Sequence, residues 1–279
     1  MAPRTFLVTG TSSGFGNNLV QEILSQGDNV VATSRDVTQL NFANSMSDNF
    51  LAVPLDVTDP ASVENAFKQA VSFFGRIDVV VNNAGFGLCG PMEELDNEQI
   101  RQQMEVNFFG CLNVTRTAVR VMREQTPSGG LIQQISSMAG LKGMPTFSVY
   151  CATKWALEGF SEAVAAEMKP EWGVRFMIVE PGGFRTNWAG PSMSFPKLRL
   201  AAYDHLDAKE RMRKRHGTQV GDPVKAGKAL YKLAVMENPP SRVTLGSDAY
   251  QVAMGKLEEY QSYTALKDFS HSTDIDNEQ

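Results

Sequence analysis

The sequence predicts an α/β fold in which seven parallel strands form a central sheet that helices cover on both faces. Two observations predict it: short apolar runs alternate with segments of helical apolar spacing, and no linker-like stretch interrupts the alternation. Strands and helices that alternate are joined by right-handed crossovers, which produce a parallel sheet covered on both faces. With 279 residues, 42% of them hydrophobic, the chain can bury a large core, so we expect one catalytic domain spanning residues 1–279.

The expected strands are apolar runs that are long enough for a buried strand and too short for a helix. They cover residues 6–8, 30–33, 50–53, 77–81, 131–135, 174–179 and 242–245. Apolar stripes mark the helices between them, such as the stripe through Val63, Phe67 and Val71. Asp59 and Pro60 begin that helix well, because Asp accepts hydrogen bonds from free N–H groups and Pro fits the first helical position.

The composition argues against several classes of protein. A net charge of −5 and a pI near 5.3 disfavour nucleic-acid binding, for which a domain pI above about 9 is usual. The three cysteines are too few and odd in number for a disulfide framework, which fits a reducing, cytoplasmic compartment. No run approaches about 18 apolar residues, so no membrane span is expected, and a strand-like segment near the start argues against a signal peptide. The histidines have no metal-ligand spacing, so no metal site is expected.

Two segments depart from the strand–helix pattern. Residues 184–216 form a long connection, and connections of this length inside α/β domains are usually functional, so we expect a lid over the substrate. The basic run at residues 211–216 either steers an anionic substrate or forms a solvated helix face, and we favour the solvated face. The polar end, residues 269–279, is expected to be a flexible tail.

A glycine-rich turn at residues 9–16 follows the first strand and precedes the first helix. Glycines permit a tight turn and let the backbone approach a pyrophosphate, to which the helix N-terminus offers free N–H groups. The spacing is G-x3-G-x-G and not the G-x-G-x-x-G fingerprint, so an ordinary strand-to-helix turn is the alternative. The candidate nucleotide-binding residues in this turn are Gly10, Thr11, Ser13, Gly14, Phe15 and Gly16.

The end of the second strand predicts which nucleotide binds. A site selective for NAD usually places Asp or Glu there, against the ribose 2′-hydroxyl. This chain has Ser34 and Arg35, and we expect the first carboxylate, that of Asp36, in the cap of the following helix. A guanidinium suits a 2′-phosphate, so the sequence favours NADP, although a lone arginine is more often a solvated surface residue.

Tyr150 and Lys154 lie four residues apart in the helical segment 146–169, so their side chains share one face. A free tyrosine has a pKa of about 10 and is a poor base at neutral pH. A neighbouring ammonium stabilises the phenolate and lowers that pKa, which suits acid–base catalysis. The alternative is an amphipathic surface pair, because this spacing also occurs by chance.

Further polar residues lie where substrates bind in α/β sheets, at the carboxyl ends of strands. Ser137 follows the fifth strand, where its hydroxyl could hold a substrate oxygen, and Asn83 follows the fourth; each could also be a turn residue. Asn107 lies inside the helical segment 97–124, where asparagine is unfavourable, so we expect a kink or a polar partner there.

Together these residues resemble the short-chain dehydrogenase/reductase family over roughly residues 4–250. The matching pieces occur in the family's order and at its distances: Thr9-Gly10-x3-Gly14-x-Gly16, Asp56-Val57, Asn82-Asn83-Ala84-Gly85, Asn107, Ser137, Tyr150-x3-Lys154 and Pro181-Gly182. The resemblance implies a doubly wound Rossmann fold. The segment 181–186 is also similar to the branch that contains 17β-hydroxysteroid and retinol dehydrogenases.

The resemblance implies roles for single residues. Tyr150 would exchange a proton with the substrate oxygen, which Ser137 would orient. Lys154 would lower the pKa of the tyrosine and bind the nicotinamide ribose, and Asn107 would hold a water in the proton relay. The other residues that would contact the cofactor are Asp56, Val57, Asn83, Ala84, Gly85, Pro181, Gly182, Phe184 and Thr186.

Several large apolar side chains should lie near these residues, because they follow strand ends or belong to the segment 184–216. They either line a bulky hydrophobic pocket or fill the core. The candidate substrate-contacting residues are Met92, Met138, Met144, Phe147 and Trp188.

The sequence therefore favours an NADP(H)-dependent oxidoreductase that interconverts a bulky hydrophobic ketone or aldehyde and its alcohol. The alternative is a non-catalytic NADP-binding regulator on the same fold, since a fold does not determine a function. Apolar residues cover most of the circumference of segments 97–124 and 146–169, and members of the family commonly pair through these helices. We therefore expect a homodimer or homotetramer.

Overall fold

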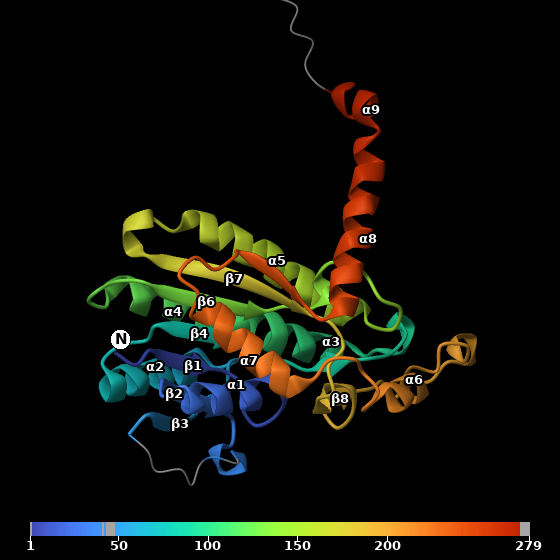
Figure 1. Ribbon diagram of the computed structural model, residues 1–279. Helices are drawn as coiled ribbons and strands as arrows, with labels where there is room; N and C mark the ends of the chain where they lie inside the picture. Colours follow the sequence, from blue (N-terminus) through green and yellow to red (C-terminus); the bar gives the residue numbers. More distant parts are fainter. Residues whose placement is uncertain (1, 41, 43–47, 274–279) are drawn as a thin grey trace, which may run out of the picture.

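The computed structural model describes residues 2–40, 42 and 48–273. Seven parallel strands form its central sheet in the order β3-β2-β1-β4-β6-β7-β9 (Figure 1), as the sequence predicts. The strands are β1 (Thr5–Val8), β2 (Asn29–Ser34), β3 (Phe50–Pro54), β4 (Val79–Asn82), β6 (Gly130–Ile135), β7 (Val174–Pro181) and β9 (Arg242–Leu245). The fold is thus the doubly wound Rossmann arrangement.

Helices cover both faces of this sheet because its strands bury side chains on both sides. Phe6 and Val8 of β1 point into one core, and Leu7 points into the other; all three side chains are buried. Helices α1 and α7 close the first core, and α2, α4 and α5 close the second. The helices are α1 (Gly14–Ser25), α2 (Pro60–Phe74), α3 (Asn97–Met104), α4 (Gly110–Glu124), α5 (Ser148–Glu167), α6 (Ala208–Arg215), α7 (Pro223–Ala234), α8 (Ser247–Thr264) and α9 (Lys267–His271).

The boundaries of α2 follow the capping signals in the sequence. The Asp59 carboxylate accepts a hydrogen bond from the backbone N–H of Ala61, and Pro60 occupies the first position. Gly75 ends the helix with φ = +82°, in the left-handed region that glycine adopts without strain.

The expected helical segment 97–124 is interrupted by a π-helical stretch, Glu105–Phe109, between α3 and α4. Asn107 lies at its centre, where the regular α-helical hydrogen-bond pattern is interrupted. A π-helical stretch inside an α-helix often marks a functional position, because it turns one side chain out of the regular helical register.

The segment 184–216 consists of short elements on the carboxyl side of the sheet. It contains the 3₁₀ turns η6 (Asn187–Ala189) and η7 (Ala201–Tyr203), strand β8 (Met193–Ser194) and helix α6. Strand β8 pairs with β5 (Gly87–Leu88) in a small parallel sheet that the sequence did not predict. This pairing ties the segment to the chain that follows β4.

The C-terminal helix α8 projects from the body of the protein (Figure 1). Of the tail expected at residues 269–279, residues 269–271 complete α9, and residues 274–279 lie outside the described residues. No helix in the described part of the chain has the length and apolar character that a membrane crossing requires.

Candidate active site

A single cleft runs along the carboxyl ends of β1, β2, β4, β6 and β7. Its volume is about 1420 Å³, and the cleft reaches from the glycine-rich turn at one end to Tyr150 and Trp188 at the other. Pockets for one small ligand usually measure about 300–1,000 Å³. The cleft is therefore large enough for a dinucleotide and a second molecule.

The glycine-rich turn forms one wall of the cleft. Gly10 and Gly14 have φ values of +70° and +58°, which side chains other than glycine rarely adopt. A Cβ on Gly10 would lie 2.9 Å from the Cα of Ala84, so the turn and the end of β4 approach too closely for a larger residue. Gly10, Ser13, Gly14 and Phe15 line the cleft, where α1 begins. This bare backbone at a helix start fits a pyrophosphate.

Two residues of the turn support it from behind and do not line the cleft. The Thr11 hydroxyl donates a hydrogen bond to the carbonyl of Thr33 at 3.0 Å, and its side chain is fully buried. A Cβ on Gly16 would lie 2.5 Å from the carbonyl oxygen of Gly10, so Gly16 lets α1 pack closely on the turn. The sequence pattern placed both with the nucleotide because it cannot distinguish a residue that contacts a ligand from one that shapes the turn.

Asn83 holds the turn in position from the end of β4. Its amide Nδ2 donates to the carbonyls of Thr9 and Gly10 at 2.8 and 3.0 Å. The Thr9 hydroxyl in turn accepts hydrogen bonds from the backbone N–H groups of Asn83 and Ala84, both at 3.0 Å. Asn83, Ala84 and Gly85 also line the cleft, so this strand end is both a support and a wall.

The end of β2 brings one arginine to the opposite end of the cleft from Tyr150. Arg35 lines the cleft and makes no hydrogen bond or ion pair with the described residues. Asp36 accepts hydrogen bonds from the backbone N–H and the hydroxyl of Thr38, which lower the pKa of its carboxyl, so it caps η1 (Val37–Gln39) as expected. Asp56 is held likewise by Thr58, which lowers its pKa, with a smaller contribution from the Arg35 charge. Ser34 and Val57 complete this end of the cleft.

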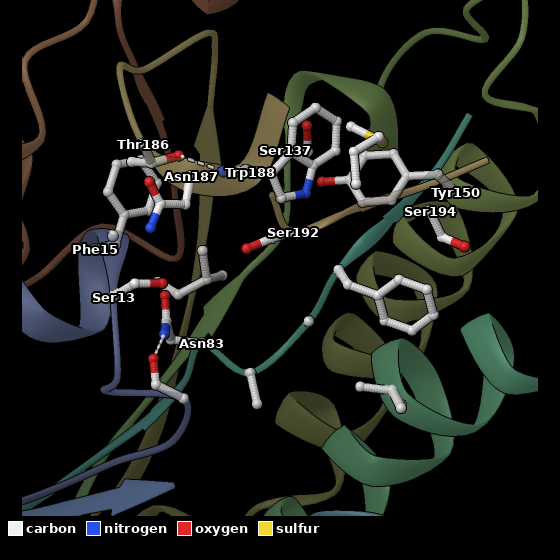
Figure 2. Close-up of a pocket in the computed structure, with 18 of the residues that line it drawn as sticks. Ser13, Phe15, Asn83, Ser137, Tyr150, Thr186, Asn187, Trp188, Ser192 and Ser194 are labelled. Atoms are coloured by element: carbon white, nitrogen blue, oxygen red, sulfur yellow. Dashed lines mark hydrogen bonds between the residues drawn. The ribbon is translucent and has the colours of Figure 1, made fainter. Parts of the chain in front are cut away.

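Tyr150 and Ser137 come together at the other end, although 12 residues and a 3₁₀ turn separate them in the chain. Figure 2 shows the two hydroxyls and the Trp188 indole pointing toward one another. Ser137 follows β6, where its Oγ accepts a hydrogen bond from the backbone N–H of Ala139 at 3.1 Å. Tyr150 lies in the first turn of α5 and is 7% exposed.

Lys154 lies one turn after Tyr150 on the same face of α5, as the spacing predicts. Its Nζ donates to the carbonyl of Ile135 at 2.8 Å and lies 5.8 Å from the centroid of the tyrosine ring. Burial lowers the pKa of Lys154 to about 8. The side chain is thus anchored to the end of β6 and faces the cleft.

The lowered tyrosine pKa that the spacing suggested is not found in this structure. Burial raises the pKa of Tyr150 well above its usual range, and the hydrogen-bonding influence of Ser137 opposes this only in part. The reason is that the ammonium of Lys154 bonds to a backbone carbonyl and not to the phenol oxygen, while the phenol is removed from water. A buried neutral phenol is a proton donor at neutral pH.

Asn107 uses its side chain to clamp the loop that follows β4. Its Oδ1 accepts from the backbone N–H of Phe86 at 3.0 Å, and its Nδ2 donates to the Phe86 carbonyl at 2.9 Å. The side chain is 2% exposed and does not line the cleft. Asn107 therefore has the polar partner expected from the sequence, and its side-chain atoms are already engaged with protein groups.

The loop after β7 crosses the cleft and meets the glycine-rich turn. The ring of Phe184 packs edge-on against Phe15 with 4.9 Å between centroids, and Thr186 lies against Gly14. A Cβ on Gly182 would lie 2.0 Å from Oδ1 of Asp248, so only glycine fits there. Pro181, Gly182, Phe184 and Thr186 all line the cleft.

Aromatic and methionine side chains form the wall around the Tyr150 hydroxyl. Trp188 stacks on Phe147 with 5.7 Å between centroids and lies 5.0 Å from the Tyr150 ring. Met138 and Met144 also line this end, as predicted. The expectation for Met92 is wrong: its side chain is 55% exposed and lies outside the cleft, because η2 (Met92–Glu94) turns it outward toward Ser148.

Further residues line the substrate end besides the candidates named above. Arg211 and Arg215 of α6 belong to the basic run, and they line the cleft together with Met193, Met212 and Gln219. The signal that could have found the arginines is their i, i+4 spacing beside the apolar Met212, which predicts one helix face against the body.

A buried acidic cluster lies behind the catalytic residues. Glu158, one turn after Lys154 on α5, accepts a hydrogen bond from the Ser136 hydroxyl at 2.5 Å. Glu158 and Glu180 both lie near Nη1 of Arg242, at 3.0 and 3.1 Å. The cluster connects the residue before Ser137 with the residue before Pro181.

Comparisons with known proteins agree with this geometry. The model of the short chain dehydrogenase family matches residues 4–195. An uncharacterized oxidoreductase of Schizosaccharomyces pombe is 39% identical, and the match covers 98% of this chain and 93% of the relative. A 3-ketodihydrosphingosine reductase of Bacteroides thetaiotaomicron is 36% identical over 88% of this chain and 89% of the relative.

Solved structures give the same result. A short-chain dehydrogenase from Streptomyces avermitilis superposes with a TM-score of 0.87 at 35% sequence identity. The superposition covers 98% of this chain and 100% of the Streptomyces chain. A short-chain dehydrogenase from Burkholderia cenocepacia in complex with NADP has a TM-score of 0.70 at 25% identity, over 95% of this chain and 97% of that one.

Proposed function

The chain belongs to the short-chain dehydrogenase family and is an oxidoreductase of that family, and we propose that it uses NADP(H) to interconvert a bulky hydrophobic ketone or aldehyde and its alcohol. The observation that carries this proposal is the position of the buried Tyr150 hydroxyl, beside Ser137 and beneath an aromatic wall, at one end of a cleft long enough for a dinucleotide. Solved relatives with bound nucleotide support the cofactor class.

The cleft fits a dinucleotide along its whole length. The bare backbone of Gly10 and Gly14 would hold the pyrophosphate, Asp56 and Val57 would border the adenine, and the loop from Pro181 to Thr186 would meet the nicotinamide. When bound, the nicotinamide supplies the hydride of the reaction.

Tyr150 is the proton donor in the reductive direction. Its phenol is protonated at neutral pH because burial raises its pKa, so it can hydrogen-bond to a carbonyl oxygen and transfer its proton as negative charge develops there. Ser137 offers a second hydroxyl to the same oxygen, which fixes the direction of approach. Lys154, whose ammonium faces the cleft, stabilises the phenolate that remains and is available to the ribose.

The choice of NADP over NAD depends on Arg35. Its guanidinium has no partner among the described residues, whereas the nearby carboxylates of Asp36 and Asp56 are engaged by Thr38 and Thr58. A free guanidinium beside engaged carboxylates favours a 2′-phosphate. Arg35→Ala should remove most of the preference for NADPH in a fluorescence titration against both nucleotides. Arg120→Ala, which removes an arginine paired with Glu64 on the surface, is the matched control. Equal binding of NADH and NADPH by the parent protein would contradict the assignment.

The nature of the wall supports a bulky apolar substrate. Trp188, Phe147, Met138 and Met144 surround the space in front of the tyrosine hydroxyl. Apolar contacts discriminate by only about 1–3 kcal/mol per methylene, so we expect broad acceptance of lipophilic carbonyls. The name of one relative, 3-ketodihydrosphingosine reductase, supports reduction of a ketone.

Tyr150→Phe tests catalysis against the alternative, a non-catalytic NADP-binding regulator. An enzyme should lose at least about 100-fold in kcat with NADPH and an aromatic ketone, because removal of a general acid typically costs about 10²–10⁴-fold. The nucleotide should bind as in the parent. Turnover that survives the substitution would contradict the role of Tyr150, and a parent protein that binds NADPH but reduces no carbonyl in a screen of steroid, retinoid, polyketide-like and sugar substrates would favour the regulator.

We further propose the organisation in which this reaction takes place. Residues 1–279 act as one catalytic domain in which the segment 184–216 orders over the substrate as a lid. The exposed faces of Phe109 and Trp155, 44% and 42% exposed, support pairing of two copies through segments 97–124 and 146–169. Three buried cysteines without a disulfide support a reducing, cytoplasmic compartment.

A further inference from the structure

The basic run of α6 divides into two faces with different surroundings. Arg211 and Arg215, one helical turn apart, line the cleft, although both are also exposed to solvent, whereas Arg213 and Lys214 do not line it. Met212, 4% exposed, packs in the apolar cluster that contains Phe147 and Tyr150, and this contact sets which face of the helix points inward. The run is therefore only in part the solvated face that its composition suggested.

The two inward arginines lie at different points of the cleft. Arg211 is close enough to Cys89 for its charge to act on the thiol, whose pKa burial raises overall. Cys89 packs with Phe147 and Met193, so Arg211 lies at the apolar substrate end. The Nη2 atom of Arg215 lies 2.7 Å from the point that a Cβ on Gly183 would occupy, beside the loop that follows β7.

Neither inward guanidinium has a hydrogen bond or an ion pair with any residue that the structure describes. On the outer face of the same helix, Arg213 makes two hydrogen bonds to Glu210, at 2.6 and 2.7 Å. Glu210 thus offsets one of the two positive charges on the outer face, whereas the two arginines that line the cleft have no acidic partner among the described residues. Two uncompensated arginines in a concave site attract an anion, because the cleft focuses their field.

A buried polar group beside Arg215 also lacks a partner. Gln219 is 8% exposed and lines the cleft, and its side-chain Oε1 has no hydrogen-bond partner among the described residues. Its Cγ lies 3.4 Å from the position of a Cβ on Gly183, the same point that Arg215 approaches. The free atom is an acceptor, so an N–H or O–H donor would satisfy it, and it does not itself bind an anion.

We propose that Arg211, with the charge of Arg215 further along the cleft, binds an acidic group of the substrate, so that the substrate is a bulky apolar carbonyl or alcohol that carries a carboxylate or a phosphate. The inference rests on the proposed function. Arginine suits such groups because its planar fork of N–H donors matches two anionic oxygens. Arg211 faces the apolar wall and not the glycine-rich turn, which assigns the anion to the substrate and not to the pyrophosphate of the nucleotide.

A binding experiment tests this without requiring turnover. Calorimetric titration of the NADP⁺-loaded protein with 2-naphthoate and with 2-naphthamide compares two aromatic ligands that differ in charge. We expect the carboxylate to bind at least about tenfold more tightly, and Arg211→Gln to remove most of that difference. Arg213→Gln removes the same charge from the outer face and should leave the ratio of the two dissociation constants unchanged.

Kinetics with an aromatic keto acid and its methyl ester provide the second comparison. Arg211→Gln should lower kcat/KM for the acid by about tenfold or more and leave that for the ester within about twofold. A parent protein that prefers neither naphthoate nor the keto acid overturns the anion site, even if the ester is reduced well. Failure to reduce any carbonyl, with naphthoate still bound through Arg211, would instead overturn the proposed function and keep the anion site.

The nucleotide is the other source of phosphate groups, so its affinity is measured for the same variants. We expect the dissociation constant of NADPH, from its fluorescence, to be unchanged within about twofold in Arg211→Gln. A large loss of NADPH affinity, with equal losses for the acid and the ester, would show that the arginines serve the cofactor and would overturn the proposal.

Discussion

Replacing Glu180 by glutamine should stabilise the protein above neutral pH and change its stability little near pH 5. Glu180 lies immediately before Pro181 at the end of β7, and its side chain is 2% exposed. It shares Arg242 with Glu158, so two buried carboxyls compete for one guanidinium that also binds the exposed Glu162. Burial, and then the charge of Glu158, raise the pKa of Glu180 to about 7, and Arg242 opposes them only in part.

The magnitude follows from this pKa. A change from 4.5 in the unfolded chain to about 7 in the folded protein corresponds to about 3 kcal/mol of differential stability. The folded state holds the proton more tightly, so this stability is complete below about pH 4.5 and is lost as the pH rises through about 7. Glutamine resembles the protonated acid and does not titrate. As the pH rises from about 4.5 to above 7, the free energy of unfolding of the variant should exceed that of the parent by up to about 3 kcal/mol. This corresponds to roughly 6–10 °C in Tm for a chain of this size.

Thermal unfolding of parent and variant from about pH 5 to about pH 8.5 measures this difference directly. Glu162→Gln is the matched control, because Glu162 binds Nη2 of the same Arg242 at 2.6 Å but is 66% exposed. Its Tm difference from the parent should vary little with pH. A difference for Glu180→Gln that stays constant over this range, or falls with rising pH, would refute the assignment of a raised pKa to this carboxyl.

Three further predictions concern the cofactor site and the assembly. Gly16→Ala should weaken NADPH binding and destabilise the protein by about 1–3 kcal/mol, because its Cβ would lie 2.5 Å from the Gly10 carbonyl oxygen. The control is Gly255→Ala, whose Cβ would have no atom within 4 Å and which should leave stability and NADPH affinity unchanged. Parent-like stability and NADPH affinity in Gly16→Ala would contradict the packing argument. The kcat/KM for NADPH should fall as the pH rises through about 8, where Lys154 loses its proton, and a profile still level at about pH 9.5 would contradict this. Light scattering at micromolar protein should give a mass above 30.6 kDa, and only a 30.6 kDa species would exclude the proposed pairing.

The sheet was predictable because strands of a parallel sheet are buried on both faces and therefore form continuous apolar runs. All seven expected strands are present: β4 begins two residues later than expected, at Val79, and most of the others extend one or two residues beyond the expected bounds. The pair β5 and β8 was not predictable, because each strand has two residues and no periodicity can be read from so short a segment. Long-range pairing, not local pattern, forms this small sheet.

The candidate site shows the same division between local and tertiary information. The spacing of Tyr150 and Lys154 placed both side chains on one helix face, because helix geometry is local. The pKa of Tyr150 also depends on burial, which raises it and which spacing does not reveal. The same limit applies to Met92, Arg211 and Arg215. The direction of each side chain depends on how a short helix packs against the body, which the local sequence pattern does not reveal.

Helix α5 links the reacting groups to the buried acidic cluster. Tyr150, Lys154 and Glu158 recur every four residues, so one face of α5 presents the phenol, the ammonium and a carboxylate in succession. The carboxylate holds the hydroxyl of Ser136, the neighbour of Ser137, and Arg242 ties it to Glu180, the neighbour of Pro181. The end of β6, the end of β7 and α5 are therefore joined through one arginine. Efficient proton transfer requires that the reacting groups be held to within a fraction of an ångström. This cluster therefore fixes the hydroxyls of Ser137 and Tyr150 relative to the loop that begins at Pro181.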